Sequence, residues 1–220
     1  MNPAEIEQAR FNMIEQQIRP WDVLDPQVLQ TMQQVPREAF VPESYQSLAF
    51  ADTNIPLGHD QVMMNPNVEG RLLQALAIQP DETVLEVGTG SGYLTACLAN
   101  LGRHVSSIDI FPDLVEGAAE KLAAYNNDNV TLSCGDALKD IDPGQRYHAI
   151  AVTGSLPVLT REFHHNLEIG DRLFIITGQL PIMEARLVTR INESNWSSES
   201  LFETCIPPLL NAAAPAEFSL

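Results

Sequence analysis

From residue 83 onward, short apolar runs alternate with amphipathic segments. The apolar runs predict buried strands at 83–88, 104–109, 130–136, 147–154 and 171–178. The amphipathic segments predict helices at 91–102, 112–126 and 158–167. Strands and helices that alternate in this way are typical of a parallel sheet covered on both faces.

The two ends of the chain follow other patterns. Near the N-terminus, residues 3–18 and 26–35 have helical patterns, whereas residues 40–58 are irregular. Near the C-terminus, residues 184–191 and 200–206 have strand patterns and are separated by a polar turn, which predicts an antiparallel hairpin at the sheet edge.

These patterns predict an α/β fold. We expect a doubly wound, mainly parallel sheet of about seven strands with an antiparallel C-terminal edge. Residues 1–80 are expected to form a helical cap and substrate loop packed on the main domain, which spans residues 81–220. The chain has no internal repeat and no low-complexity linker.

Composition narrows the classes of partner. The 220 residues suit one ordinary domain, and an apolar fraction of 45% is ample for a packed core. The formal net charge of −17 argues against nucleic acid or an anionic membrane as the partner. No apolar run is long enough to span a membrane, and the first ten residues do not resemble a signal peptide. We therefore expect a soluble, cytoplasmic protein, whose oligomeric state the sequence does not indicate.

The cysteines and histidines do not predict a metal site. Cys97, Cys134 and Cys205 are far apart and lack metal-ligand spacing, so buried thiols are expected. The five histidines include the pair His164-His165 but no spacing typical of a metal-binding helix. We expect no bound metal.

A glycine-rich segment, "EVGTGSG" (86–92), ends the first predicted strand and opens a helix. Ligands of open parallel sheets bind at such strand ends, where glycines allow close backbone approach. A dinucleotide-binding loop would read G-x-G-x-x-G, but Tyr93 stands where its last glycine would fall. Glu86 would also repel a pyrophosphate. A nicotinamide dehydrogenase is therefore disfavoured.

Three acids end three successive predicted strands. Glu86 suits the amino group of S-adenosylmethionine, and Asp109 can accept hydrogen bonds from two ribose hydroxyls. Asp136, in the segment "CGDA", can meet the amino group of adenine. Any one of these acids could simply cap the helix that follows it. Together they favour a cationic nucleoside cofactor.

Several segments resemble the protein-L-isoaspartate O-methyltransferases. "VLEVGTGSGYLTACLA" is common to many methyltransferases, but "MIEQQIRPWDVLDPQVLQTMQQVPREAFVP" and "ADTNIPLGHDQ" are similar to segments specific to this family. "YHAIAVTG" and "IPPLL" also fall where the family has matching segments. The resemblance covers most of the chain. It implies a methyltransferase fold and the transfer of a methyl group from S-adenosylmethionine to the free carboxylate of an isoaspartyl residue in a protein or peptide.

The resemblance also implies site residues. The cofactor-binding candidates are Glu86, Gly88, Thr89, Gly90, Ser91, Gly92, Asp109, Ile110, Gly135, Asp136, Ala137 and Thr153, the last beside the methyl donor. The substrate-loop candidates are Asp52, Pro56, Gly58, His59, Asp60, Gln61, Val62, Met63, Met64 and Asn65.

The substrate loop departs from the family pattern. The family's Thr-Ile-Ser aligns with Val62-Met63-Met64, so Met64 takes the place of the serine usually assigned to catalysis, and Asp60 replaces a glycine. A carboxylate nucleophile is already ionised at neutral pH, so the reaction mainly requires orientation and exclusion of water. Methionine cannot donate the orienting hydrogen bond that a serine donates. No catalytic residue is therefore assigned from the sequence, and weak or absent isoaspartyl activity is predicted.

Other interpretations remain open. Gln61, His59, Asn65 or backbone N–H groups could replace the missing donors, and the two methionines could pack over the cofactor. The acceptor could instead be neutral or cationic and oriented by Asp60. A protein that binds the cofactor without catalysis, as a regulatory or interaction partner, is the alternative from another functional class.

Overall fold

The computed structural model describes residues 2–158 and 162–213. Its main sheet has seven strands in the order β5-β4-β3-β6-β7-β8-β9. Neighbouring strands from β5 to β7 run parallel, and β8 and β9 are antiparallel. The predicted doubly wound, mainly parallel fold with an antiparallel C-terminal edge is confirmed.

The elements have the following bounds. The strands of the main sheet are β3 (Thr83–Val87), β4 (His104–Asp109), β5 (Val130–Cys134), β6 (Tyr147–Leu156), β7 (Leu167–Gln179), β8 (Ile182–Arg190) and β9 (Trp196–Thr204). The α-helices are α1 (Pro3–Met13), α2 (Pro26–Gln34), α3 (Arg37–Phe40), α4 (Pro66–Leu76), α5 (Tyr93–Leu101), α6 (Pro112–Ala124) and α7 (Ala137–Asp140). A separate hairpin consists of β1 (Ile55–Gly58) and β2 (Gln61–Met63).

Local chemistry explains where the N-terminal helices begin. Asn2 and Glu5 form a capping box at the start of α1, and the Asp25 side chain accepts hydrogen bonds from two backbone N–H groups at the start of α2. Asn65 caps α4, whose first residue is a proline with no N–H to satisfy. The helical stretch predicted at 3–18 continues beyond α1 as a π-helical turn over Ile14–Ile18.

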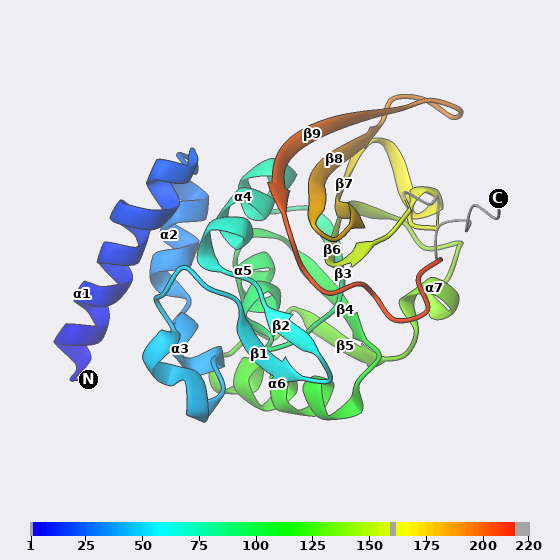
Figure 1. Cartoon of the computed structure of the whole chain (residues 1–220). Helices are drawn as coiled ribbons and strands as arrows, with labels where there is room; N and C mark the ends of the chain where they lie inside the picture. The colour runs from blue at the N-terminus through cyan, green and yellow to red at the C-terminus, as the bar shows by residue number, and fades with distance from the viewer. Residues whose placement is uncertain (1, 159–161, 214–220) are drawn as a thin grey trace.

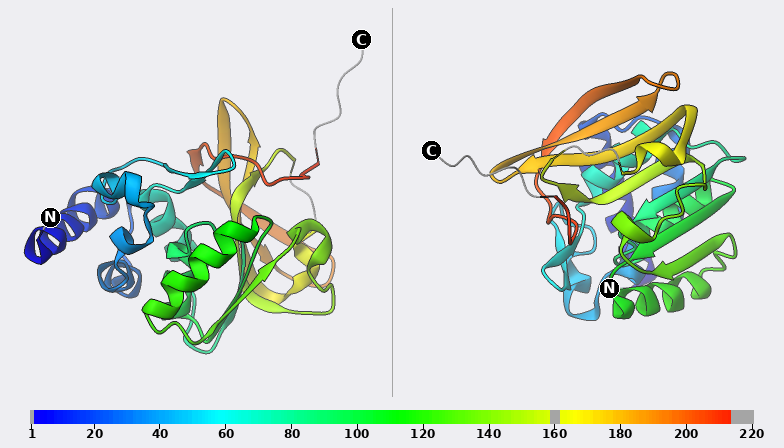
Figure 2. Two further views of the ribbon diagram at one scale, coloured as in Figure 1. Left: turned by 90° about the horizontal axis from the view of Figure 1, so that it is seen from below. Right: turned by 90° about the vertical axis from the view of Figure 1, so that its right-hand side faces the viewer.

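The N-terminal segment shares a core with the sheet. One hydrophobic cluster joins Ile18 and Met32 of this segment to Val84, Leu98 and Phe174 of the sheet and its helices. A second cluster lies on the opposite sheet face. Figure 1 shows α2 (blue) beside α4 and α5, with α1 on the outer side of α2, and Figure 2 shows the N-terminal helices from below and from the side.

The prediction of a helix at 158–167 is wrong for the residues of this segment that the structure describes. Residues His164–Asn166 form one 3-10 turn, Leu167 already belongs to β7, and residues 159–161 lie outside the described residues. The Asn166 side chain donates to the carbonyls of Asp142 and Gln145, both at 2.8 Å. These hydrogen bonds hold the short turn against the loop that contains Asp142 and Gln145. The residues are more than twenty positions apart, so the local sequence pattern does not reveal the interaction.

The C-terminal hairpin is longer than predicted. β8 and β9 pair over eight registered positions, and β9 begins at Trp196, inside the segment predicted to be a turn. Trp196 packs against the ring of His164 and beneath the guanidinium of Arg190. No helix in residues 2–158 and 162–213 has the length and apolar character to cross a membrane.

Candidate active site

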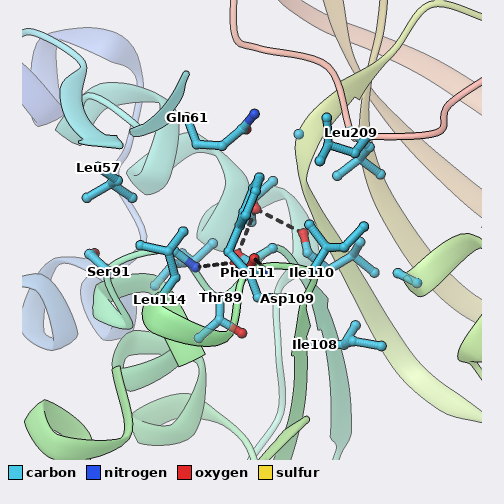
Figure 3. Close-up of a pocket in the computed structure, with 18 of the residues that line it drawn as sticks. Leu57, Gln61, Thr89, Ser91, Ile108, Asp109, Ile110, Phe111, Leu114 and Leu209 are labelled. Carbon is cyan, nitrogen blue, oxygen red and sulfur yellow. Dashed lines mark hydrogen bonds between the residues drawn. The ribbon is translucent and has the colours of Figure 1, made fainter. Parts of the chain in front are cut away.

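A cavity lies between the carboxyl ends of the parallel strands and the β1–β2 hairpin. β3 stands at the point where the strand order reverses, because β4 and β5 lie on one side of it and β6 on the other. Crevices at this position bind ligands in open α/β sheets. Figure 3 shows Leu57 and Gln61 of the hairpin on one side of the cavity and Leu209 on the other, with Asp109 between them.

Most of the predicted residues meet in this cavity. Its wall includes Gln61, Val62, Met63, Met64, Gly88, Thr89, Gly90, Ser91, Asp109, Ile110, Gly135, Asp136, Ala137 and Thr153. The wall does not include Asp52, Pro56, Gly58, His59, Asp60, Asn65, Glu86 or Gly92. Two expected site regions, the glycine loop and the substrate loop, therefore face one another across a single space.

The first turn of the glycine loop needs glycine for two reasons. Gly88 has φ +96°, and a Cβ placed there would lie 2.2 Å from the Thr153 hydroxyl oxygen. That hydroxyl donates to the carbonyls of Val87 and Gly88, at 2.9 and 2.8 Å. The end of β6 is thus tied to the end of β3, and backbone lines the crevice between them.

Asp109 sits at the end of β4 with 7% of its surface exposed. Its two carboxylate oxygens accept from the backbone N–H groups of Gly90 (2.8 Å) and Phe111 (3.0 Å). Each carboxylate oxygen can accept a further hydrogen bond. The acid therefore holds the glycine loop and keeps acceptor capacity toward the cavity.

Asp136 follows β5 and caps α7. Its side chain accepts from the Leu138 N–H (3.1 Å), the Lys139 ammonium (2.7 Å) and the Asn211 amide (3.0 Å). The hydrogen bond from Lys139 lowers the pKa of Asp136, with smaller contributions from Leu138 and Asn211. The carboxylate is charged at neutral pH and is held beside the cavity.

Glu86 is fully buried beneath the glycine loop and does not line the cavity. Its Oε2 accepts from the hydroxyls of Thr95 (2.5 Å) and Ser107 (2.6 Å), and the Ser107 hydroxyl lies 2.6 Å from that of Thr89. Its Oε1 has no hydrogen-bond partner among the described residues. Burial raises the pKa of Glu86 to about 8, although the two hydroxyls oppose the shift. The hydroxyls of Ser107 and Thr89 connect the Glu86 side chain to the cavity wall.

Gly92 has a packing function. It precedes α5 with φ +85°, and a Cβ there would lie 3.0 Å from the Ala118 Cβ. Only a residue without a side chain allows α5 and α6 to approach so closely.

The substrate loop forms the β1–β2 hairpin and the residues that follow it. Met63 and Met64 are buried and line the cavity. Arg37, buried in α3, donates to the carbonyls of Met64 (2.7 Å) and Ala49 (2.9 Å) and forms an ion pair with Glu69. The loop backbone is therefore anchored from beneath by a buried arginine.

Glu69 also faces this space. It is buried in α4, lines the cavity and pairs with Arg37. Burial raises the pKa of Glu69 to about 7, and the charge and hydrogen bond of Arg37 oppose that shift. Among the described residues that line the cavity, none is a lysine, an arginine or a histidine.

Two other loop residues, Asn65 and Asp60, do not line the cavity. The Asn65 side chain donates to Asp52 (2.9 Å), and its backbone N–H donates to the Asn54 side chain (3.0 Å). Asp60 is exposed in the hairpin turn with φ +57°, a backbone conformation that suits the family's glycine better. Asp60 is not positioned to orient an acceptor inside the cavity.

Several wall residues were missed by sequence reasoning. They are Leu57, Glu69, Val87, Leu94, Ile108, Phe111, Leu114, Leu138, Gly154, Leu209 and Leu210. Phe111 follows Asp109 so closely that its place at the strand end could have been anticipated. Glu69 lies inside a helix pattern, and nothing local distinguishes it from a surface residue. Among the residues that the structure describes, no group of three or more His, Cys, Asp or Glu side chains could hold a metal ion.

Comparison with known proteins identifies a family. Residues 8–211 match the family model described as protein-L-isoaspartate(D-aspartate) O-methyltransferase. Protein-L-isoaspartate O-methyltransferase 1 of Rhodopseudomonas palustris is 38% identical over 203 residues, covering 91% of this chain and 82% of the relative. The corresponding enzyme of Protochlamydia amoebophila is 36% identical over 201 residues, with 90% and 95% covered.

Solved structures agree on the fold. A chain from Plasmodium falciparum, solved in complex with S-adenosyl-L-homocysteine, superposes with a TM-score of 0.79 at 21% identity and covers 93% of this chain and 97% of its own. A second structure, a protein-L-isoaspartate O-methyltransferase, gives a TM-score of 0.78 at 19% identity, with 92% and 65% covered.

Proposed function

Because the chain belongs to the protein-L-isoaspartate(D-aspartate) O-methyltransferase family, we propose that it methylates the free carboxylate of isoaspartyl residues in proteins or peptides, using S-adenosylmethionine, and does so slowly. The observation that carries the proposal is one cavity with two unlike walls. One wall consists of glycine-loop backbone and strand-end acids, and the other carries Val62 and Met64 where the family carries hydroxyl residues.

The strand-end wall fits the cofactor. Asp109 would accept hydrogen bonds from the ribose hydroxyls, since each of its oxygens has spare acceptor capacity. Asp136 would face the adenine amino group, and Gly88 lines the cavity without a side chain, because a Cβ there would collide with Thr153. When bound, the cofactor supplies an electrophilic methyl group; the residues around it hold it and exclude water.

Glu86 would act indirectly. The sequence suggested that Glu86 points at the amino group of the cofactor, but its buried carboxyl contacts Ser107 and Thr95 instead. We therefore propose that Glu86 positions the glycine loop through the Ser107 and Thr89 hydroxyls.

The hairpin wall supports a low rate. An acceptor carboxylate must be oriented toward the methyl group, and an orienting donor contributes roughly 10²-fold or more to rate. Met64 supplies no donor, and of the candidate replacements only Gln61 lines the cavity, whereas His59 and Asn65 do not. The Gln61 amide is the side-chain donor that we propose in place of the serine.

The direct test uses labelled S-adenosylmethionine and three peptides that differ at one residue, isoaspartate, aspartate or alanine. We expect slow labelling of the isoaspartyl peptide alone. Label on none of the peptides, together with measurable cofactor binding, would contradict the proposal and favour the non-catalytic alternative, which the apolar methionine wall also fits. Label on all three would indicate another acceptor.

The remaining expectations are part of the same proposal. The net charge of −17 supports a partner that is neither nucleic acid nor anionic membrane. A cytoplasmic location is proposed as well, because no apolar run of the sequence has the length of a membrane span. The division into a cap of residues 1–80 and a cofactor-binding domain of residues 81–220 is also proposed, on the basis that the hairpin forms one wall of the cavity and the strand ends form the other.

A further inference from the structure

The β1–β2 hairpin lies over the cofactor wall. Leu57 and Gln61 of the hairpin share the cavity with Phe111 and Leu114, which lie just beyond the end of β4 (Figure 3). The Leu57 side chain comes within 3.1 Å of the position that a Cβ on Gly90 would occupy. A ligand held at the glycine loop would therefore be covered by the hairpin.

The His59 side chain attaches the tip of the hairpin to that wall. The His59 ring stacks on the Phe111 ring, with centroids 4.1 Å apart and planes 12° from parallel. His59 Nε2 lies 2.9 and 3.0 Å from the two carboxylate oxygens of Asp113, in the first turn of α6. The Phe111 backbone N–H donates to Asp109, so this attachment reaches the proposed ribose acid.

The backbone of the tip is in a conformation that needs such support. Gly58, His59 and Asp60 have φ values of +94°, +54° and +57° in succession. Only one of them is a glycine, and a positive φ is unfavourable for residues that have a Cβ. A sparsely populated backbone conformation persists when surrounding contacts hold it. The His59 ring contacts Phe111 and Asp113, and the Gln61 amide donates to the His59 carbonyl at 3.5 Å.

We propose that His59 is a positioning residue whose stacking on Phe111 and pairing with Asp113 form a clasp that holds the hairpin over the cofactor cavity. Release of the cofactor product requires the clasp to open, because the hairpin covers the ligand. The same clasp fixes Gln61 and Val62, two and three residues further along, toward the acceptor. The identity of the ligand rests on the function proposed above, but the clasp itself does not.

The experiment measures dissociation of S-adenosyl-L-homocysteine from the full-length protein by stopped-flow displacement, without any methyl acceptor. His59→Asn is the main variant, because asparagine tolerates a positive φ and removes the ring. Dissociation should accelerate about tenfold, the effect expected from losing one ring contact and one hydrogen bond. Adding Asp113→Ala to His59→Asn should cause little further change, since the two residues act through one contact.

His104→Asn is the matched control. His104 is also a partly exposed histidine, and its ring nitrogen lies 3.1 Å from the Thr131 hydroxyl, but it stands at the opposite end of β4 from Phe111. The control should dissociate like the wild type. Equal dissociation rates in the wild type and His59→Asn would overturn the proposal.

A second measurement needs no ligand. Amide hydrogen exchange of residues 55–63 in the ligand-free protein should be at least about fivefold faster in His59→Asn, while exchange in α5 stays unchanged. If the wild type binds no S-adenosyl-L-homocysteine, the proposed function fails. The hydrogen-exchange result then still shows whether the clasp holds the hairpin. Unchanged exchange in the hairpin would refute the clasp whatever the protein binds.

Discussion

The two walls of the cavity are built in different ways. On the sheet side, Asp109 and Gly88 are placed by strand ends, and each is held by backbone hydrogen bonds across neighbouring strands. On the hairpin side, Met64 is held by a single buried side chain, Arg37, which reaches it from another helix. Sheet topology determines the first wall, whereas long-range side-chain contacts determine the second.

This difference separates binding from turnover. The sheet wall keeps the residues that the family pattern leads one to expect, so cofactor binding should be ordinary. The hairpin wall keeps its position but not its chemistry, because Val62 and Met64 replace two hydroxyl residues. Each wall can therefore be altered while the other is monitored.

The largest effect is expected from removing the anchor of the hairpin wall. Arg37→Ala would leave Glu69 buried without its partner, which costs about 3–5 kcal/mol of stability. Urea unfolding measures this loss. The exposed pair Arg19–Glu15 is the control, and Arg19→Ala should cost under about 0.5 kcal/mol.

A double variant sharpens this result. Arg37→Met combined with Glu69→Leu removes both buried charges and should recover much of the lost stability, as apolar replacements of buried ion pairs do. If Arg37→Ala unfolds at the same urea concentration as the wild type, the account of the anchored loop is wrong.

The pH dependence of stability tests whether the buried Glu86 carboxyl supports the sheet wall from beneath. Its pKa is raised from 4.5 to about 8 in the folded protein, so the native state keeps a proton that the unfolded state loses. Its contribution to stability is therefore full below pH 4.5 and is lost as the pH rises toward 8. The slope is about 1.4 kcal/mol per pH unit for one proton.

Glu86→Gln removes this titration and keeps the hydrogen-bond acceptor for Ser107 and Thr95. Urea unfolding at pH 5, 6, 7 and 8 should show wild-type stability falling relative to the variant. The variant should still bind the cofactor, because the action of Glu86 is indirect. Parallel stability curves would show that Glu86 is ionised across this range.

A smaller effect is expected from the ribose acid. Asp109→Ala removes the carboxylate that we propose as the acceptor of the ribose hydroxyls, and cofactor affinity should fall roughly tenfold, about 1.4 kcal/mol. Calorimetry measures the change. Asp128→Ala, in an exposed loop before β5, is the control and should bind as the wild type does. Equal affinity in Asp109→Ala would remove Asp109 from the site.

The residues of the sheet wall could be predicted from the sequence for a physical reason. Apolar runs identify buried strands, parallel strands bring their carboxyl ends to one edge, and residues such as Gly135 and Thr153 follow directly. The helix predicted at 158–167 failed because the side chain of Asn166 bonds a distant loop instead of continuing a helix. Such a contact leaves no periodic signal.

The supporting interactions could not be predicted from local patterns. Glu86 was recognised as an acid at a strand end, but its burial depends on Thr95 and Ser107 from two other elements. Glu69 was not recognised at all, since its charge is matched by Arg37, thirty-two positions away. These contacts connect elements that are distant in the chain, so only the folded structure reveals them.

The most direct test of the central claim is isoaspartyl turnover by the wild type and by Val62→Thr/Met64→Ser, with cofactor affinity measured on both proteins. Asp60 is left unchanged, because its side chain lies outside the cavity. Restoring the two hydroxyls should raise turnover roughly 10²-fold and leave cofactor affinity unchanged. Equal turnover by the two proteins would contradict the claim that the hairpin wall, and not the cofactor wall, limits this enzyme.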